Sequence, residues 1–122
     1  MILIPWITAI ALAMADEIVV SRLLRIEYTN FRLQWERDGK PRGIFWIPEE
    51  AKIGSWYITY ASGHAGQLAR WRWLFADPDW ATEVEEARPL ILLHRIFLPG
   101  FVVCAIAPFV IAAFTQWRLF SY

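Results

Sequence analysis

The chain has 122 residues, of which 57% are hydrophobic and 20% are charged, and its twelve basic residues are balanced by twelve acidic ones. This length allows one domain at most, and a zero net charge gives no overall attraction to nucleic acid. The single cysteine, Cys104, excludes an internal disulfide and a cysteine-based metal cluster.

The first segment, residues 1–21, is apolar up to Asp16 and permits two interpretations. The sequence AMA at 13–15 resembles the small-residue pattern that signal peptidases cleave. A secretory signal normally begins with basic residues, however, and this segment carries no charge before Asp16. We therefore predict an uncleaved transmembrane helix over residues 1–21, with Pro5 in its first turn.

The first helix is predicted to continue beyond the membrane. Apolar side chains recur at spacings of four, four, three and four residues from Val20 to Trp35, which indicates one continuous helical stripe. The sequence DGKP at 38–41 combines a glycine suited to a helix C-cap with a proline, so a helix of about 30 residues should end there.

The middle region, residues 22–89, is predicted to form further amphipathic helices, with breaks near 39–48, 62–66 and 76–78. An i, i+3, i+4, i+7 spacing from Ile53 to Tyr60 favours a helix over 50–61, although the run WYITY at 56–60 is also typical of a strand.

After the predicted break near 62–66, residues 67–75 are predicted to resume a helix. The pair Asp77-Pro78 predicts the start of another helix, which continues toward the second apolar segment with a bend at Pro89.

The second apolar segment contains 19 uncharged residues, 96–114, enough for a helix to cross about 30 Å of hydrocarbon. Membrane helices tolerate prolines such as Pro99 and Pro108. The alternative, a core helix of a soluble protein, would need a larger domain to surround it. We predict a transmembrane helix over residues 90–116, followed by a short tail at 117–122.

The basic residues predict the orientation of this hairpin. Eleven of the twelve lie between the two apolar segments, and only Arg118 follows the second. The positive-inside rule therefore places the middle in the cytoplasm and both termini outside. The predicted fold is all-α: a two-transmembrane-helix hairpin with an amphipathic helical cytoplasmic middle region.

Several local sequences carry a resemblance to a known family. The sequences DGKP, SWYITYA and DPDW, placed between two apolar segments, resemble the layout of the universal stress protein B group of small two-span bacterial inner-membrane proteins. The segment FADPDWATEVEEARPLILL is similar in layout to the part that leads those proteins into their last helix. The resemblance implies a bacterial inner-membrane location and no established catalytic site.

Charged residues mark the same depth on both predicted spans. Asp16 and Glu17 end the first span, and His94 and Arg95 begin the second. Because charges at a membrane boundary usually face a partner, we expect one of the acids to pair with Arg95 and His94. The alternative is that the acids reach water while Arg95 binds lipid phosphate.

Two other sets of residues are candidates for contacts within or beyond the chain. Small residues at helical spacing, which let helices approach closely, are Ala9, Ala13, Gly100, Cys104 and Ala112. Aromatic and basic residues suited to anchoring at the membrane surface or at a protein interface are Trp6, Trp46, Trp56, Arg70, Trp71, Arg72, Trp73, Trp80 and Trp117.

The sequence predicts no enzyme. No nucleophile–base pair or phosphate-binding loop stands out, and His64 and His94 lack a metal-ligand spacing, so no cofactor or metal is expected. We expect a non-catalytic accessory subunit that packs against a larger integral membrane complex, respiratory or photosynthetic, with no nucleic-acid partner. The alternative is a freestanding, stress-related inner-membrane protein that interacts with lipids.

Overall fold

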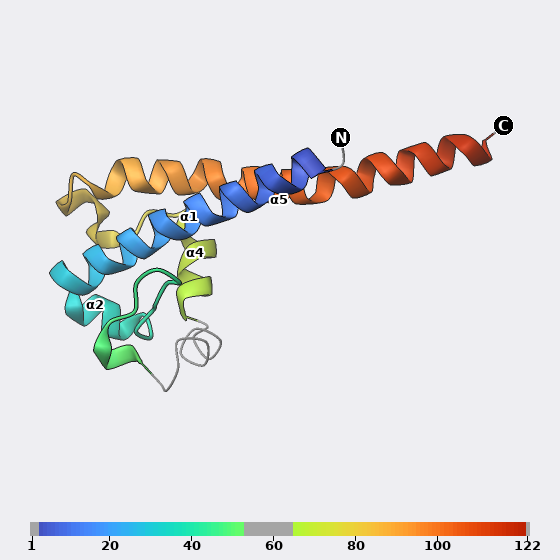
Figure 1. Cartoon of the computed structure of the whole chain (residues 1–122). Coiled ribbons are helices and arrows are strands. Elements are labelled where there is room, and N and C mark those ends of the chain that lie inside the picture. Colours follow the sequence, from blue (N-terminus) through green and yellow to red (C-terminus); the bar gives the residue numbers. More distant parts are fainter. Residues whose placement is uncertain (1–2, 53–64, 122) are drawn as a thin grey trace.

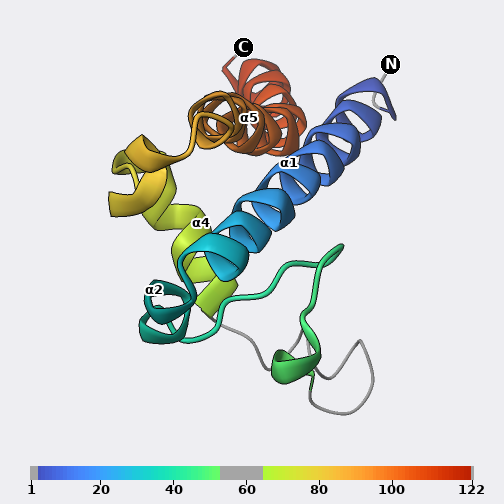
Figure 2. The same cartoon turned by 90° about the vertical axis from the view of Figure 1, so that its left-hand side faces the viewer.

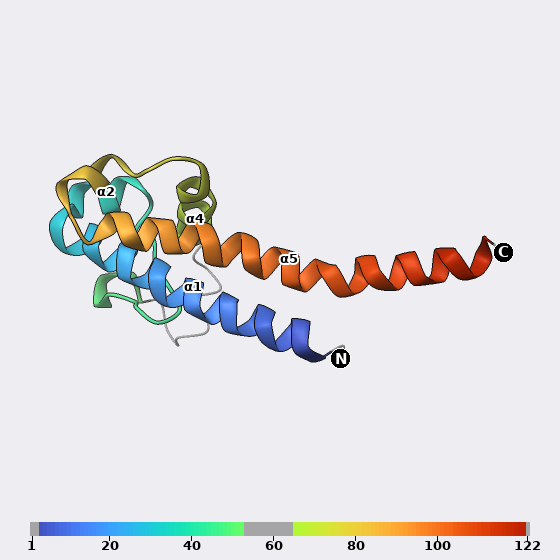
Figure 3. The ribbon, with the colours of Figure 1, turned by 90° about the horizontal axis from the view of Figure 1, so that it is seen from above.

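The computed structural model describes residues 3–52 and 65–121, and every regular element in these ranges is helical. Two long helices pack side by side in opposite directions, and shorter helices lie at the end of the pair away from the chain termini (Figures 1 and 3). We call this end, residues 31–52 and 65–86, the head. In chain order the elements are α1 (Leu3–Asn30), α2 (Arg32–Arg37), η1 (Glu49–Ala51), α4 (Ala65–Phe75), η2 (Asp79–Glu83) and α5 (Ala87–Phe120). The all-α prediction is confirmed for these ranges.

The two long helices are the predicted apolar segments. Both α1 and α5 are long and apolar enough to cross a membrane, by length and composition alone. α5 runs from Ala87 to Phe120, so most of the predicted tail at 117–122 is helical. Instead of the predicted bend, Pro89 lies in the first turn of α5. Proline fits there because the N–H that it lacks would have no partner within the helix.

The predicted continuation of the first helix to Trp35 is wrong, because the helix breaks at Phe31. This residue has φ −134° and ψ 54°, and α2 starts after it. The ring of Phe31 stacks on Trp80 at 5.5 Å, while the buried Trp35 donates a hydrogen bond from Nε1 to the carbonyl oxygen of Pro41. These contacts fold the chain back into the head, which a straight helix would not allow.

The predicted stop after α2 has a clear backbone cause. Gly39 and Lys40 adopt φ values of 90° and 54°, the left-handed region that ends helices and that glycine enters without strain. The chain then returns alongside α1 (Figure 2). A Cβ atom on Gly43 in this segment would lie only 2.3 Å from Ser21 Oγ. Most of the predicted helix at 50–61 lies outside the described residues.

The helix predicted to start at Pro78 is much shorter than expected. Asp79 to Glu83 form the 3-10 helix η2, and Val84 is extended, so η2 does not continue into α5. Trp80 on η2 is buried against α4 and α1. Because this side chain is held in the core, the chain must turn again before Ala87.

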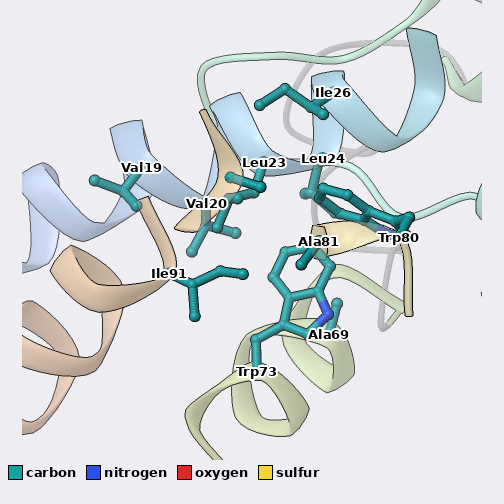
Figure 4. Packing of buried hydrophobic residues seen from close by; sticks show 11 residues of the cluster. Val19, Val20, Leu23, Leu24, Ile26, Ala69, Trp73, Trp80, Ala81 and Ile91 are labelled. Atoms are coloured by element: carbon teal, nitrogen blue, oxygen red, sulfur yellow. The ribbon is translucent and has the colours of Figure 1, made fainter. Parts of the chain in front are cut away.

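The hydrophobic core lies where α1, α4, η2 and α5 meet (Figure 4). Trp73 on α4 and Trp80 on η2 approach edge to face at 6.1 Å, and Trp80 lies beside Leu24 of α1. The core residues of the cluster are Val19, Val20, Leu23, Leu24, Ile26, Ala69, Trp73, Trp80, Ala81, Ala87 and Ile91. The head is therefore packed onto the half of the helix pair that lies away from the chain termini.

Candidate functional site

A buried group of charged side chains joins three helices just beyond the core. Asp16 and Glu17 come from α1, Arg70 from α4 and His94 from α5, and we call these four residues the polar cluster. His94 Nδ1 lies 2.6 Å from Asp16 Oδ1. Arg70 pairs with Glu17, and its Nε lies 3.7 Å from Asp16 Oδ2. The cluster therefore cross-links α1, α4 and α5 at one level.

The two ring nitrogens of His94 both face oxygen atoms. Nε2 lies 2.8 Å from the carbonyl oxygen of Arg70, which can only accept a hydrogen bond, so Nε2 carries a proton. Nδ1 faces the carboxylate of Asp16, which also accepts when it is ionised. One further proton therefore lies between Nδ1 and the carboxyl group of Asp16, and His94 fixes the position of α4 as well as that of α1.

Arg70 has the place that we expected for Arg95. Its side chain is 14% exposed and has carboxylates on two sides. Burial lowers the pKa of the guanidinium, and the negative charge of Asp16 opposes that shift. An arginine remains charged under such conditions, so Arg70 supplies the permanent positive charge of the cluster.

The expected pairing of Arg95 with Asp16 or Glu17 is wrong. Arg95 Nε donates to the carbonyl oxygen of Trp73 at 3.0 Å, and a terminal nitrogen lies 2.7 Å from Asp77 Oδ1. Arg95 is the residue after His94 on α5, so its side chain leaves the helix about 100° away and cannot reach the same carboxylate. It ties the C-terminal end of α4 to α5 instead.

A cavity of about 400 Å³ adjoins the polar cluster, and Asp16, Glu17 and Arg70 line it together with apolar side chains such as Leu98 and Phe101. Glu17 Oε2 is buried and has no hydrogen-bond partner within the described residues. The arrangement contains charged side chains that hold one another and a small apolar space beside them. These ion pairs can therefore hold the three helices together.

A second buried carboxyl group, that of Glu27, was not singled out from the sequence. Trp80 Nε1 donates to Glu27 Oε2 at 2.9 Å across 53 residues of sequence, and Glu27 is fully buried. A sequence signal existed, because Glu27 lies seven residues after Val20 and three after Leu24, in register with the apolar stripe. An acid on the apolar face of a helix needs a donor, and here an indole supplies it.

The predicted Trp and Arg anchors include both buried and exposed residues. On α4, Trp73 is buried with Arg70, whereas Trp71 and the side chain of Arg72 are about half exposed. The prediction that residues 70–73 form one interfacial group is thus wrong for its first and last members, because positions three apart share a helix face.

The remaining anchors differ in the same way. Trp80 is buried, whereas Trp46 is half-buried with its ring 5.2 Å from that of Tyr28. Trp6 meets Phe109 edge to face at 5.7 Å, and Trp117 is exposed. Trp56 and His64 lie outside the described residues.

The predicted small-residue positions lie at different places along the helix pair. Ala9 is buried, and a Cβ atom on Gly100 would lie 3.3 Å from Leu12 Cδ1, so α1 and α5 approach closely there. Ala13 and Cys104 are half-buried, whereas Ala112 is exposed. Ala9 and Gly100 therefore lie where α1 and α5 meet, whereas Ala112 does not.

No family model, curated protein or solved structure matches this chain. The resemblance to the universal stress protein B group stays a prediction.

Proposed function

We propose that this chain is a non-catalytic accessory subunit, which crosses the bacterial inner membrane with α1 and α5 and packs against a larger integral membrane complex. The head lies in the cytoplasm in this proposal, because the basic residues concentrate there. The polar cluster acts as the joint that holds the head and the two spans in one fixed arrangement.

The observation that carries this proposal is the second half of α5. Every residue from Phe109 to Phe120 is exposed, and most of them are large and apolar. Figures 1 and 3 show that α5 runs on past the start of α1, and none of the other described elements lies beside that part. A helix that is apolar on every side needs lipid or another membrane helix around it.

A second observation favours a rigid role. The head is joined to α1 and α5 by a hydrophobic core and by buried charge pairs, so a partner that binds α5 also receives a fixed head. Because packing and not hydrophobicity holds membrane helices together, a rigid, preformed surface suits a stabilising subunit.

The test is site-specific photo-crosslinking from within the membrane, combined with native electrophoresis in mild detergent. A photoreactive residue at Ile111 should crosslink to one defined larger protein, and the chain should migrate with it. The same residue at Leu92, on α5 beside the head and 55% exposed, is the matched control. A chain that migrates alone and crosslinks only to lipid would favour the freestanding lipid-interacting protein instead.

A further inference from the structure

One face of α1 is left uncovered by the other residues that the structure describes. Ile7, Ile10, Met14 and Ile18 follow one another at spacings of three and four residues, and each exposes between 53% and 64% of its surface. The same face continues into Arg22 and Arg25, which are also exposed. It is opposite the face that contacts α5, so an apolar stripe ends directly at two positive charges.

A cavity of about 590 Å³ lies at that end of the stripe. Its lining combines the apolar Ile18, Phe45 and Trp46 with the polar Ser21, Arg22 and Arg25. Ser21 is buried, and its hydroxyl has no hydrogen-bond partner within the described residues. The cavity thus presents both apolar and charged side chains beside the end of the stripe.

The charges in this cavity leave one positive charge in excess. Arg22 forms an ion pair with Glu86, which also lines the cavity. Arg25 has no ion pair or hydrogen bond in the part of the chain that the structure describes. One uncompensated guanidinium is matched by the single negative charge of a phosphodiester.

We propose that this cavity binds the headgroup of an anionic phospholipid, such as phosphatidylglycerol. The phosphodiester lies against Arg25 and Arg22, and an acyl chain follows the stripe toward Ile7. From Arg22 to Ile7 the helix rises about 22 Å, more than the roughly 15 Å depth of one leaflet of hydrocarbon. A free phosphate ion would use the arginines but not the stripe.

This inference rests on the membrane location in the proposed function and not on a partner complex. The head lies on the side of the anionic leaflet in that proposal, where a basic residue near the surface strengthens lipid binding about fivefold. Arg25 is exposed, so replacing it leaves the core and the polar cluster intact.

The experiment is native mass spectrometry of the purified full chain titrated with phosphatidylglycerol or with phosphatidylcholine. We expect one phosphatidylglycerol to bind clearly more tightly than phosphatidylcholine, and Arg25→Gln to weaken it about fivefold. The control is Arg37→Gln, an exposed arginine on α2 away from the cavity, which should bind like the wild type.

Three results would overturn the proposal: equal binding of both lipids, equal losses in Arg25→Gln and Arg37→Gln, or displacement of the lipid by millimolar inorganic phosphate. The last result would identify the site as one for free phosphate. The accessory-subunit proposal can fail independently, because it is tested by the crosslink from Ile111. Arg25→Gln should still form that crosslink to the same partner.

Discussion

Replacing Arg70 by methionine tests whether the polar cluster is the joint that holds the head to the two long helices. Methionine keeps most of the length of the side chain but removes the charge, so the buried carboxyl groups of Asp16 and Glu17 lose the permanent cation that faces both of them. Removing one partner of a buried ion pair costs about 3–5 kcal/mol, because the other charge stays in a dry environment. For a chain of this size, that should lower the melting midpoint by about 10–20 °C.

The matched control is Arg72→Met on the same helix. Arg72 is 56% exposed on its side chain and lies 3.6 Å from Asp38, whereas Arg70 is 14% exposed. An exposed pair of this kind contributes about 0–1 kcal/mol, so the control should melt near the wild type. The assay is thermal unfolding in mild detergent, followed by tryptophan fluorescence.

The pairing itself is tested by a double-mutant cycle with Glu17→Gln. If Arg70 and Glu17 act as a pair, the double variant should be more stable than the sum of the two single losses predicts, by about 0.5–3 kcal/mol. Additive losses, or a midpoint of Arg70→Met as high as that of Arg72→Met, would refute the reasoning that a buried charge joint holds the head.

Two further predictions concern the segment that returns along α1. Gly43→Ala should destabilise the fold by about 1–3 kcal/mol in the same melting assay, because a Cβ atom there would lie 2.3 Å from Ser21 Oγ. Acidification should also loosen this segment, because hydrogen bonds from Tyr28 and Arg32 lower the pKa of Glu50 from its ordinary 4.5. That contribution is present above pH 4.5 and is lost as the pH falls through the lowered pKa.

Both predictions have internal controls. Gly100→Ala places its Cβ atom 3.3 Å from Leu12 Cδ1, the end of a flexible side chain, so it should cost much less than Gly43→Ala. Glu50→Gln cannot titrate and should lack the acid-dependent loss that the wild type shows below pH 4.5. Equal melting of the two alanine variants, or the same acid response in Glu50→Gln and the wild type, would contradict these explanations.

The sequence alone determined the features that depend on neighbouring residues. Two long apolar runs predict two long helices, because backbone hydrogen bonds within a helix need no contribution from the rest of the chain. The end of α2 is equally local, since Gly39 adopts a positive φ that glycine permits. The sequence likewise predicted that charged residues of the two long helices meet at one level, because such residues end the first apolar segment and begin the second.

Tertiary structure decided which side chains meet. Arg70 and Arg72 are both arginines on α4, yet only Arg70 faces Asp16, because the rotation of the helix is set by the burial of Trp73. The break at Phe31 likewise depends on Trp80, 49 residues later, on which its ring stacks. Helical periodicity fixes the relative directions of side chains within one helix, but packing between helices fixes their absolute directions.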